Sequence, residues 1–169
     1  MKRAIFFAAL LALLVAVPMG LRAEQFLGEF GDWSAYTNGK GGKKSCYIAS
    51  LPKKTEGKYK KRGETYILLT HWPALKDFNV IELRAGYTYK KDSEVRLNID
   101  TNAFSLFVAG GTAWARDKKT DRLLARAMIK GVRLVALGTS SKGTRTRDTY
   151  SLSGFTAAYK AIGKACGVP

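Results

Sequence analysis

The clearest structural pattern in the chain is EVRLNIDTNAFSLFV, residues 94–108. Apolar Val95, Leu97 and Ile99 alternate with polar neighbours, which predicts a strand with one buried face. Asp100-Thr101-Asn102 has the composition of a turn. The alternation then resumes at 104, 106 and 108, so the whole segment predicts a β-hairpin.

Seven further segments have strand-like composition, and clusters of Lys, Gly, Asn or Pro separate most of them. Short strands with frequent turns are typical of an antiparallel sandwich or barrel. We therefore predict a mainly β protein. The additional strands are expected at 33–37, 45–50, 65–72, 80–87, 112–116, 132–138 and 149–152.

One short internal helix is expected near residue 120. Thr120 is a suitable N-cap, Asp121 suits the first turn, and Gly131 follows as a stop signal. Leu124 and Met128 lie one helical turn apart between them. These features predict a helix between Thr120 and Gly131.

A second helix is expected at the C-terminus. Ser153 can serve as its N-cap, and Gly167 followed by Pro169 would end it. An apolar stripe at helical spacing runs along this segment, and it consists of Phe155, Tyr159, Ile162 and Cys166. The spacing predicts that Cys166 faces the core.

Residues 1–23 have the features of a secretory signal peptide. Lys2 and Arg3 precede an uncharged run at 4–19, and Ala23 offers a small residue for cleavage. The run is short for a membrane span. We predict export to the periplasm or the medium, with residues 24–169 forming a single β-sandwich domain and no transmembrane segment.

The charge of the chain is strongly positive. Lys and Arg number 29 against 13 Asp and Glu, for a formal net charge of +16. Residues 1–23 carry three cations and no acid, so their removal would leave +13. Such a charge favours encounters with lipopolysaccharide, phospholipid headgroups, nucleic acid or acidic glycans. It is equally compatible with solubility alone.

The two cysteines are Cys46 and Cys166. In an oxidising compartment an even pair favours a disulfide, which here would join the second predicted strand to the C-terminal helix. An intermolecular bridge and two free thiols are the alternatives. Two cysteines and one histidine are too few soft ligands for a tetrahedral zinc site. We predict no metal and no cofactor.

The sequence contains no recognisable catalytic constellation. His71, the only histidine, falls on the same face of a predicted strand as Ile67 and Leu69, which is typical of a structural histidine. Glu82 and Asp100 lie in predicted strands and are the strongest candidates for a pair of catalytic carboxylates. We expect both to face solvent.

A second weak signal is Gly110-Gly111-Thr112, which could in principle hold a phosphate. It lacks the lysine and the following helix of a P-loop. It is therefore predicted to be a turn or bulge.

The most prominent functional feature is a basic segment at 53–62. Six of its ten residues are Lys or Arg, and Glu56 is its one acid. A binder of single-stranded nucleic acid would interleave more aromatic residues with these cations than Tyr59 alone. Envelope anions are therefore favoured over nucleic acid, and a solvated face is the alternative. The candidate anion-binding residues are Lys40, Lys43, Lys44, Lys53, Lys54, Lys58, Lys60, Lys61 and Arg62.

Several short motifs are similar to those of the invasion-associated locus B family of alphaproteobacterial secreted proteins. They are Phe30-Gly31-Asp32-Trp33, the polar strand after Cys46, the segment 131–138, Tyr150-Ser151-Leu152-Ser153-Gly154-Phe155, and the final helix ending in Cys166. The resemblance covers nearly the whole chain after residue 23.

The resemblance implies a periplasmic or envelope-associated β-sandwich of immunoglobulin-like type that is fastened by cysteine. It also implies a link to host-cell entry, with no established catalytic mechanism. A pattern we associate with the family has a further cysteine after the tryptophan, and residues 33–37 contain none. Cys46 and Cys166 are then the only available pair.

Three hypotheses of function follow from the sequence. The first is a non-enzymatic envelope interaction domain that contacts an anionic component or a protein partner through the basic segment. The second is a hydrolase that uses carboxylates such as Glu82 and Asp100. The third is a structural envelope protein whose charge serves solubility.

Overall fold

The computed structural model describes residues 24–168, so the predicted signal peptide at 1–23 lies outside the described residues. Over the described part of the chain, one antiparallel sheet of eleven strands is joined by two α-helices. The strands are β1 (Gln25–Phe30), β2 (Trp33–Asn38), β3 (Ser45–Ser50), β4 (Lys54–Gly57), β5 (Tyr66–Trp72), β6 (Asp77–Arg84), β7 (Glu94–Ile99), β8 (Asn102–Ala109), β9 (Thr112–Trp114), β10 (Arg133–Thr139) and β11 (Arg145–Ser151). The helices are α1 (Lys118–Lys130) and α2 (Phe155–Cys166), and short 3-10 turns occupy Gly41–Lys43 (η1) and Pro73–Leu75 (η2).

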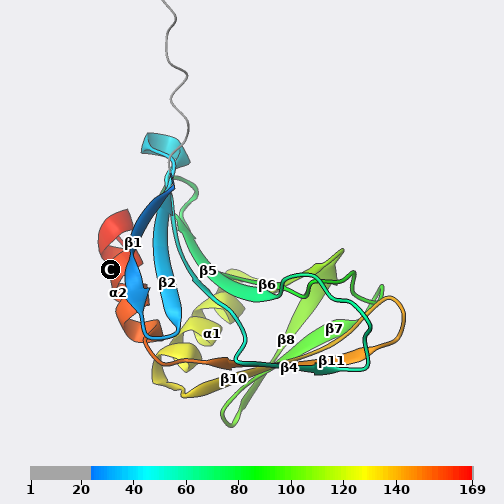
Figure 1. Cartoon of the computed structure of the whole chain (residues 1–169). Coiled ribbons are helices and arrows are strands. Elements are labelled where there is room, and N and C mark those ends of the chain that lie inside the picture. The colour runs from blue at the N-terminus through cyan, green and yellow to red at the C-terminus, as the bar shows by residue number, and fades with distance from the viewer. Residues whose placement is uncertain (1–23, 169) are drawn as a thin grey trace, which may run out of the picture.

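The sheet is continuous, in the order β1-β2-β3-β5-β6-β9-β8-β7-β10-β11-β4. It bends so that β5 and β6 lie across the core from β10 and β11, as Figure 1 shows. Hydrogen bonds close one end of this bend, where the Trp33 indole N–H donates to the Ser151 carbonyl at 3.0 Å. The mainly β, antiparallel class predicted from the sequence is confirmed, and its two facing layers come from one folded sheet.

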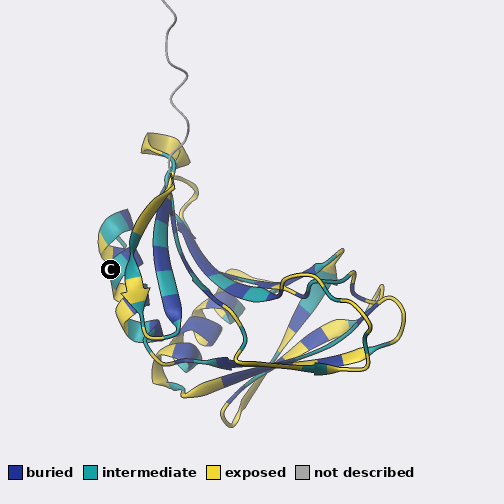
Figure 2. Ribbon diagram, in the orientation of Figure 1, coloured by how far each residue is buried: buried dark blue, intermediate teal, exposed yellow. Residues whose placement is uncertain are grey.

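The hairpin predicted at 94–108 is confirmed as β7 and β8. Ile99 pairs with Asn102 across the turn, and Asp100 adopts a left-handed conformation with φ of 48°. Val95, Leu97 and Ile99 are fully buried, because the alternate face of β7 meets the core. Figure 2 shows the same alternation of buried and exposed residues along β7.

Two strands were not predicted from the sequence, and both are edge strands. β1 contains a bulge between Phe26 and Gly28, which interrupts its alternation. β4 lies within the basic segment and pairs only with β11. Their residues are mostly exposed, so neither carries the apolar period that identifies a half-buried strand.

The helix near residue 120 begins earlier than predicted. Asp117 is the N-cap of α1, and its side chain accepts a hydrogen bond from the Thr120 amide at 2.7 Å. Thr120 is therefore inside the first turn, because a carboxylate three residues upstream satisfies its N–H. Gly131 is the C-cap, as predicted.

The C-terminal helix also starts differently from the prediction. Gly154, and not Ser153, is the N-cap of α2, with φ of 84° and no side-chain cap. The turn needs glycine because a Cβ there would lie 1.7 Å from the Phe30 carbonyl oxygen. The predicted apolar stripe and the stop at Gly167 are confirmed.

The disulfide between Cys46 and Cys166 is formed within the chain, with the two Cα atoms 6.0 Å apart. It joins β3 to the last residue of α2. The helix α2 packs on the core face of β1, β2 and β3. The intermolecular and free-thiol alternatives are not observed, since neither cysteine is free. Neither described helix is long and apolar enough to span a membrane.

Candidate functional site

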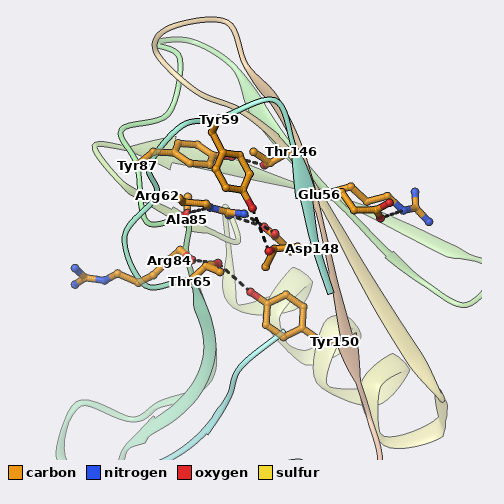
Figure 3. A network of polar contacts seen from close by, with 12 residues as sticks. Glu56, Tyr59, Arg62, Thr65, Arg84, Ala85, Tyr87, Thr146, Asp148 and Tyr150 are labelled. Carbon is orange, nitrogen blue, oxygen red and sulfur yellow. Dashed lines mark hydrogen bonds and ion pairs between the residues drawn. The ribbon is translucent and has the colours of Figure 1, made fainter. Parts of the chain in front are cut away.

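The basic segment ends in a buried ion pair. The two terminal nitrogens of Arg62 donate to the two carboxylate oxygens of Asp148, each at 2.6 Å. Arg62 lies in the loop between β4 and β5, and Asp148 lies on the inward face of β11 (Figure 3). The side chains are only 6% and 5% exposed. A parallel two-bond pair of this kind is among the strongest protein hydrogen bonds.

Further contacts hold the Arg62 guanidinium in a single orientation. Its Nε donates to the Ala85 carbonyl at 2.6 Å. The rings of Tyr87 and Tyr59 lie 5.0 and 5.6 Å from its central carbon, so aromatic faces enclose the cation. Burial opposes the charge, but the hydrogen bond and charge of Asp148 outweigh it and raise the Arg62 pKa. The arginine is therefore permanently charged.

Neutral hydroxyl groups surround this pair. The Tyr87 hydroxyl hydrogen-bonds with Thr146 at 2.6 Å, and the Tyr150 hydroxyl lies 3.3 Å from that of Thr65. Burial raises the pKa of Tyr87 and of Tyr150 above the usual tyrosine value. Both phenols therefore stay protonated and act as hydrogen-bonding groups.

Glycine allows the loop before β5 to approach the loop after β6. Gly86 has φ of 71°, and a Cβ there would lie 2.2 Å from the Gly63 carbonyl oxygen. The Gly63 amide donates to the Gly86 carbonyl at 2.9 Å. This close backbone contact places Arg62 directly beside Ala85 and Tyr87.

Above the ion pair lies a cleft of about 490 Å³ between the β4–β5 loop and the β10–β11 turn. Four exposed lysines line it, with hydroxyl side chains between them, and no carboxylate is among its lining residues. The lysines are Lys58, Lys60, Lys61 and Lys142, and the hydroxyl residues are Tyr59, Tyr87, Thr88, Ser140, Ser141, Thr144 and Thr146. We refer to this surface as the lysine cleft.

The structure divides the predicted anion-binding residues among three places. Only Lys58, Lys60, Lys61 and Arg62 line the lysine cleft. Arg62 is one of the predicted anion-binding residues, but its guanidinium is buried and already paired with Asp148.

The remaining lysines are paired or distant. Lys53 forms an ion pair with Asp32, and Lys54 forms one with Glu56 at 2.8 Å. The other three, Lys40, Lys43 and Lys44, lie in and beside η1 at the opposite end of the molecule from the loop after β4 (Figure 1). They are separated because β3 and the crossing to β4 lie between the two groups.

Sequence reasoning missed the acidic partner of Arg62 and did not place the β10–β11 turn beside the basic segment. Asp148 was hidden in the run 145–151, whose alternation places Thr146, Asp148 and Tyr150 on one face. That two-residue period was the available signal. The two-residue period does not show which loop meets this face, because that depends on the order of strands in the sheet.

The histidine that could have served in catalysis lies in the protein interior. His71 is fully buried, its Nδ1 accepts from the Asn79 amide at 3.1 Å, and its Nε2 has no partner among the described residues. Burial lowers its pKa to about 4. Within residues 24–168 no cluster of His, Cys, Asp and Glu is arranged to hold a metal ion.

The two candidate carboxylates are engaged in separate places. Glu82 on β6 accepts from Arg84 at 2.9 Å. Asp100 lies in the β7–β8 turn that its composition predicted, rather than within the preceding strand, and it accepts hydrogen bonds from the amides of Val132 and Arg133. Gly110 lies in the turn between β8 and β9, as predicted.

These features define a disulfide-linked, mainly β protein that carries a lysine-lined cleft over a buried ion pair. The chain belongs to the invasion associated locus B (IalB) protein family, whose model matches residues 33–163. The family resemblance noted in the sequence is thereby confirmed.

One solved structure has the same fold. It is the crystal structure of invasion associated protein B from Bartonella henselae, with a TM-score of 0.52 and 18% sequence identity. The match covers 82% of this chain and 96% of that one. No curated protein sequence matches this chain significantly.

Proposed function

We propose that this protein is a non-enzymatic, envelope-located binding protein that holds anionic envelope components in the lysine cleft. The favoured ligands are the phosphate groups of lipopolysaccharide or of an acidic phospholipid surface. The observation that carries the proposal is a concave site with four lysines, several hydroxyl groups and no carboxylate among its lining residues. A protein partner with an acidic surface is the alternative ligand.

The cleft has the chemistry that phosphate binding needs. Lysine ammonium groups supply charge-assisted hydrogen bonds, and neutral hydroxyls donate further ones to phosphate oxygens. Because Asp148 already neutralises Arg62, the buried pair orders the cleft floor without adding net charge. Attraction therefore depends on the exposed Lys58, Lys60, Lys61 and Lys142, and salt should weaken it.

Two observations support a location in the envelope. The features of residues 1–23 predict export, and the Cys46–Cys166 disulfide is stable in an oxidising compartment. Membership of a family described as invasion associated supports a further proposal, that envelope binding contributes to host-cell invasion.

The carboxylate hydrolase is the weaker hypothesis. A hydrolytic pair must converge on one bond. Glu82 is bound by Arg84, whereas Asp100 is bound by the backbone of Val132 and Arg133, so the two carboxylates share no partner. His71 is buried, which removes it from any exposed substrate.

The test is retention of the purified, oxidised protein on vesicles that contain lipopolysaccharide or acidic phospholipid. The cleft variant changes Lys58, Lys60, Lys61 and Lys142 to Gln. The control variant makes the same charge change outside the cleft, at Lys40, Lys43, Lys119 and Lys160. Retention at ~0.05 M salt should weaken at ~0.15 M, where exposed charges are more strongly screened.

We expect the cleft variant to lose retention and the control to keep most of it. Equal losses in both variants would mean that net charge, not the cleft, attracts the vesicles. No retention of the unaltered protein at ~0.05 M salt would overturn the proposal.

A further inference from the structure

A second concave surface lies on the other limb of the sheet, over β1, β2, β3 and β5. It is a groove of about 880 Å³, and we call it the β1 groove. Its floor consists of the outward side chains of these strands, such as Tyr36, Tyr47 and Leu68. Their strand neighbours Ala35, Ile48 and Leu69 are buried in the core, on the face that α2 covers.

Aromatic rings form a ladder across three strands at this surface. Tyr36 on β2 stacks against Tyr47 on β3, with ring centroids 5.1 Å apart and an interplanar angle of 18°. Phe26 on β1 packs against Tyr36 at 5.4 Å and is 54% exposed. Rings of this kind contact aliphatic stems and cations favourably.

The charge of the β1 groove is opposite to that of the whole chain. Four carboxylates line it, and Lys53 is its one lining cation, although the chain has a net charge of +16. The carboxylates belong to Glu24, Glu29, Asp32 and Glu82. Asp32 pairs with Lys53, and Glu82 pairs with Arg84. No cation among residues 24–168 forms an ion pair with the other two.

The wall that carries Glu24 and Glu29 is also an edge of the sheet. β1 pairs with β2 on one side and is the terminal strand of the sheet order. An edge strand presents unpaired backbone donors and acceptors, which can accept a further strand.

We propose that the β1 groove binds an extended, basic polypeptide segment, which pairs with the free edge of β1. Alternate Lys or Arg side chains of this segment point to the same side. They would extend over the aromatic ladder toward Glu24 and Glu29. Carboxylates and aromatic faces both attract cations. Backbone pairing supplies affinity, and the two glutamates select for positive charge.

The inference is independent of anion binding at the lysine cleft. The two surfaces share no lining residue, and their fixed charges have opposite signs. A chain with this arrangement could hold an anionic surface through one limb and a basic segment through the other.

The probe is a synthetic peptide of ten residues with alternating Lys and Thr, and the matched control peptide has Glu in place of Lys. Binding to the purified, oxidised protein is measured by calorimetry. The groove variant is Glu24→Gln with Glu29→Gln. Its control removes two exposed acids outside the groove, Glu64→Gln with Asp92→Asn.

We expect the Lys peptide to bind saturably and the Glu peptide not to bind. The groove variant should bind the Lys peptide about tenfold more weakly, since two exposed charge pairs are lost, and the control variant should bind nearly as the parent does. The lysine-cleft variant should bind it at least as well as the parent.

Hydrogen exchange then distinguishes strand addition from charge attraction alone. The peptide should slow exchange of amides in β1 specifically. Absence of this protection, equal weakening in both variants, or displacement of the peptide by a neutral oligosaccharide such as cellohexaose would each overturn the proposal.

Discussion

Arg62 and Asp148 are 86 residues apart in the sequence, yet their side chains meet through two parallel hydrogen bonds of 2.6 Å. The pair links the basic β4–β5 loop to the inward face of β11, beneath the lysine cleft. Because both groups are buried, neither can be hydrated if the other is lost. The geometry of the cleft therefore depends on the Arg62–Asp148 pair, which is buried beneath the cleft surface.

Removal of one member of this pair should be strongly destabilising. Arg62→Met leaves the Asp148 carboxylate buried and unpaired, which is expected to cost about 3–5 kcal/mol in free energy of unfolding. Urea denaturation measures the cost. Arg116→Met is the control, because Arg116 pairs with Glu94 in an exposed position and should cost less than about 1 kcal/mol. Similar costs for both variants would contradict the assigned role of the buried pair.

The disulfide should contribute much of the stability. Cys46 and Cys166 are separated by 120 residues, and closure of a loop of this length in the unfolded chain is worth about 4–5 kcal/mol. We expect a marked fall in melting temperature when a reductant is added. The double variant with Ser at both positions should have a similarly low melting temperature without reductant. Addition of reductant should not change it. An unchanged melting temperature of the reduced parent would contradict this expectation.

His71 should make the protein less stable in mild acid. Burial lowers its pKa from 6.5 to about 4, so the unfolded chain binds a proton over this interval that the folded protein does not. Stability is therefore fully present above about pH 6.5 and is lost as the pH falls toward 4, by about 2–3 kcal/mol. Between about pH 4 and 6, urea midpoints should rise with pH less steeply, or fall more steeply, in His71→Asn than in the parent, because the variant lacks this contribution.

Asp121 should give stability the opposite dependence on pH. Its carboxylate accepts from the Ile81 amide, because the short strand β9 does not reach that part of β6. Burial raises its pKa from 3.8 to about 6, although the hydrogen bond from Ile81 opposes the rise. The folded protein thus binds the extra proton, and stability falls as the pH rises from about 4 to 6, by about 2 kcal/mol.

The variant Asp121→Asn isolates this effect. It keeps a side-chain oxygen for the Ile81 amide and removes the titrating group. Between about pH 4 and 6 it should gain stability with rising pH more steeply than the parent, since only the His71 slope remains. A shallower slope in Asp121→Asn than in the parent would show that the sign assigned to Asp121 is wrong.

Gly154 should be intolerant of any side chain. Its φ is 84°, and a Cβ would lie 1.7 Å from the Phe30 carbonyl oxygen. Gly154→Ala is expected to cost more than about 3 kcal/mol, since a clash adds to the left-handed strain. Gly143→Ala is a matched control, because Gly143 has φ of 81° with no atom within 4 Å of the added Cβ. It should cost about 1–2 kcal/mol, the strain alone. Equal losses of stability in the two variants, measured by thermal unfolding, would contradict the close approach of Gly154 to the Phe30 carbonyl.

Local periodicity was sufficient to predict most elements of this fold. The two-residue alternation at 95–99 predicted β7, and the helical spacing from Phe155 to Cys166 predicted the buried stripe of α2. Such patterns are visible because each depends on neighbours within one turn or one strand. The edge strands β1 and β4 lack that pattern, since sheet pairing orders them and burial does not.

Capping was harder to predict because alternative caps lie close together. Thr120 has a suitable side chain, but the Asp117 carboxylate accepts a hydrogen bond from the Thr120 amide. The helix therefore starts one turn earlier. At α2 the approach of Phe30 to Gly154 decides the start, and that contact joins segments far apart in the chain.

The sequence by itself determined the mainly β class, the pair of cysteines and the abundance of lysine. Only the tertiary structure decided which cations share a surface. A run of like charges shows only that cations are close along the chain. In the folded protein, β3 and the crossing to β4 separate the η1 turn from the loop after β4, and these two segments lie at opposite ends of the molecule (Figure 1). The bend of the sheet brings Asp148 to Arg62 and Lys142 to Lys58, because packing of the core, not sequence separation, sets those distances.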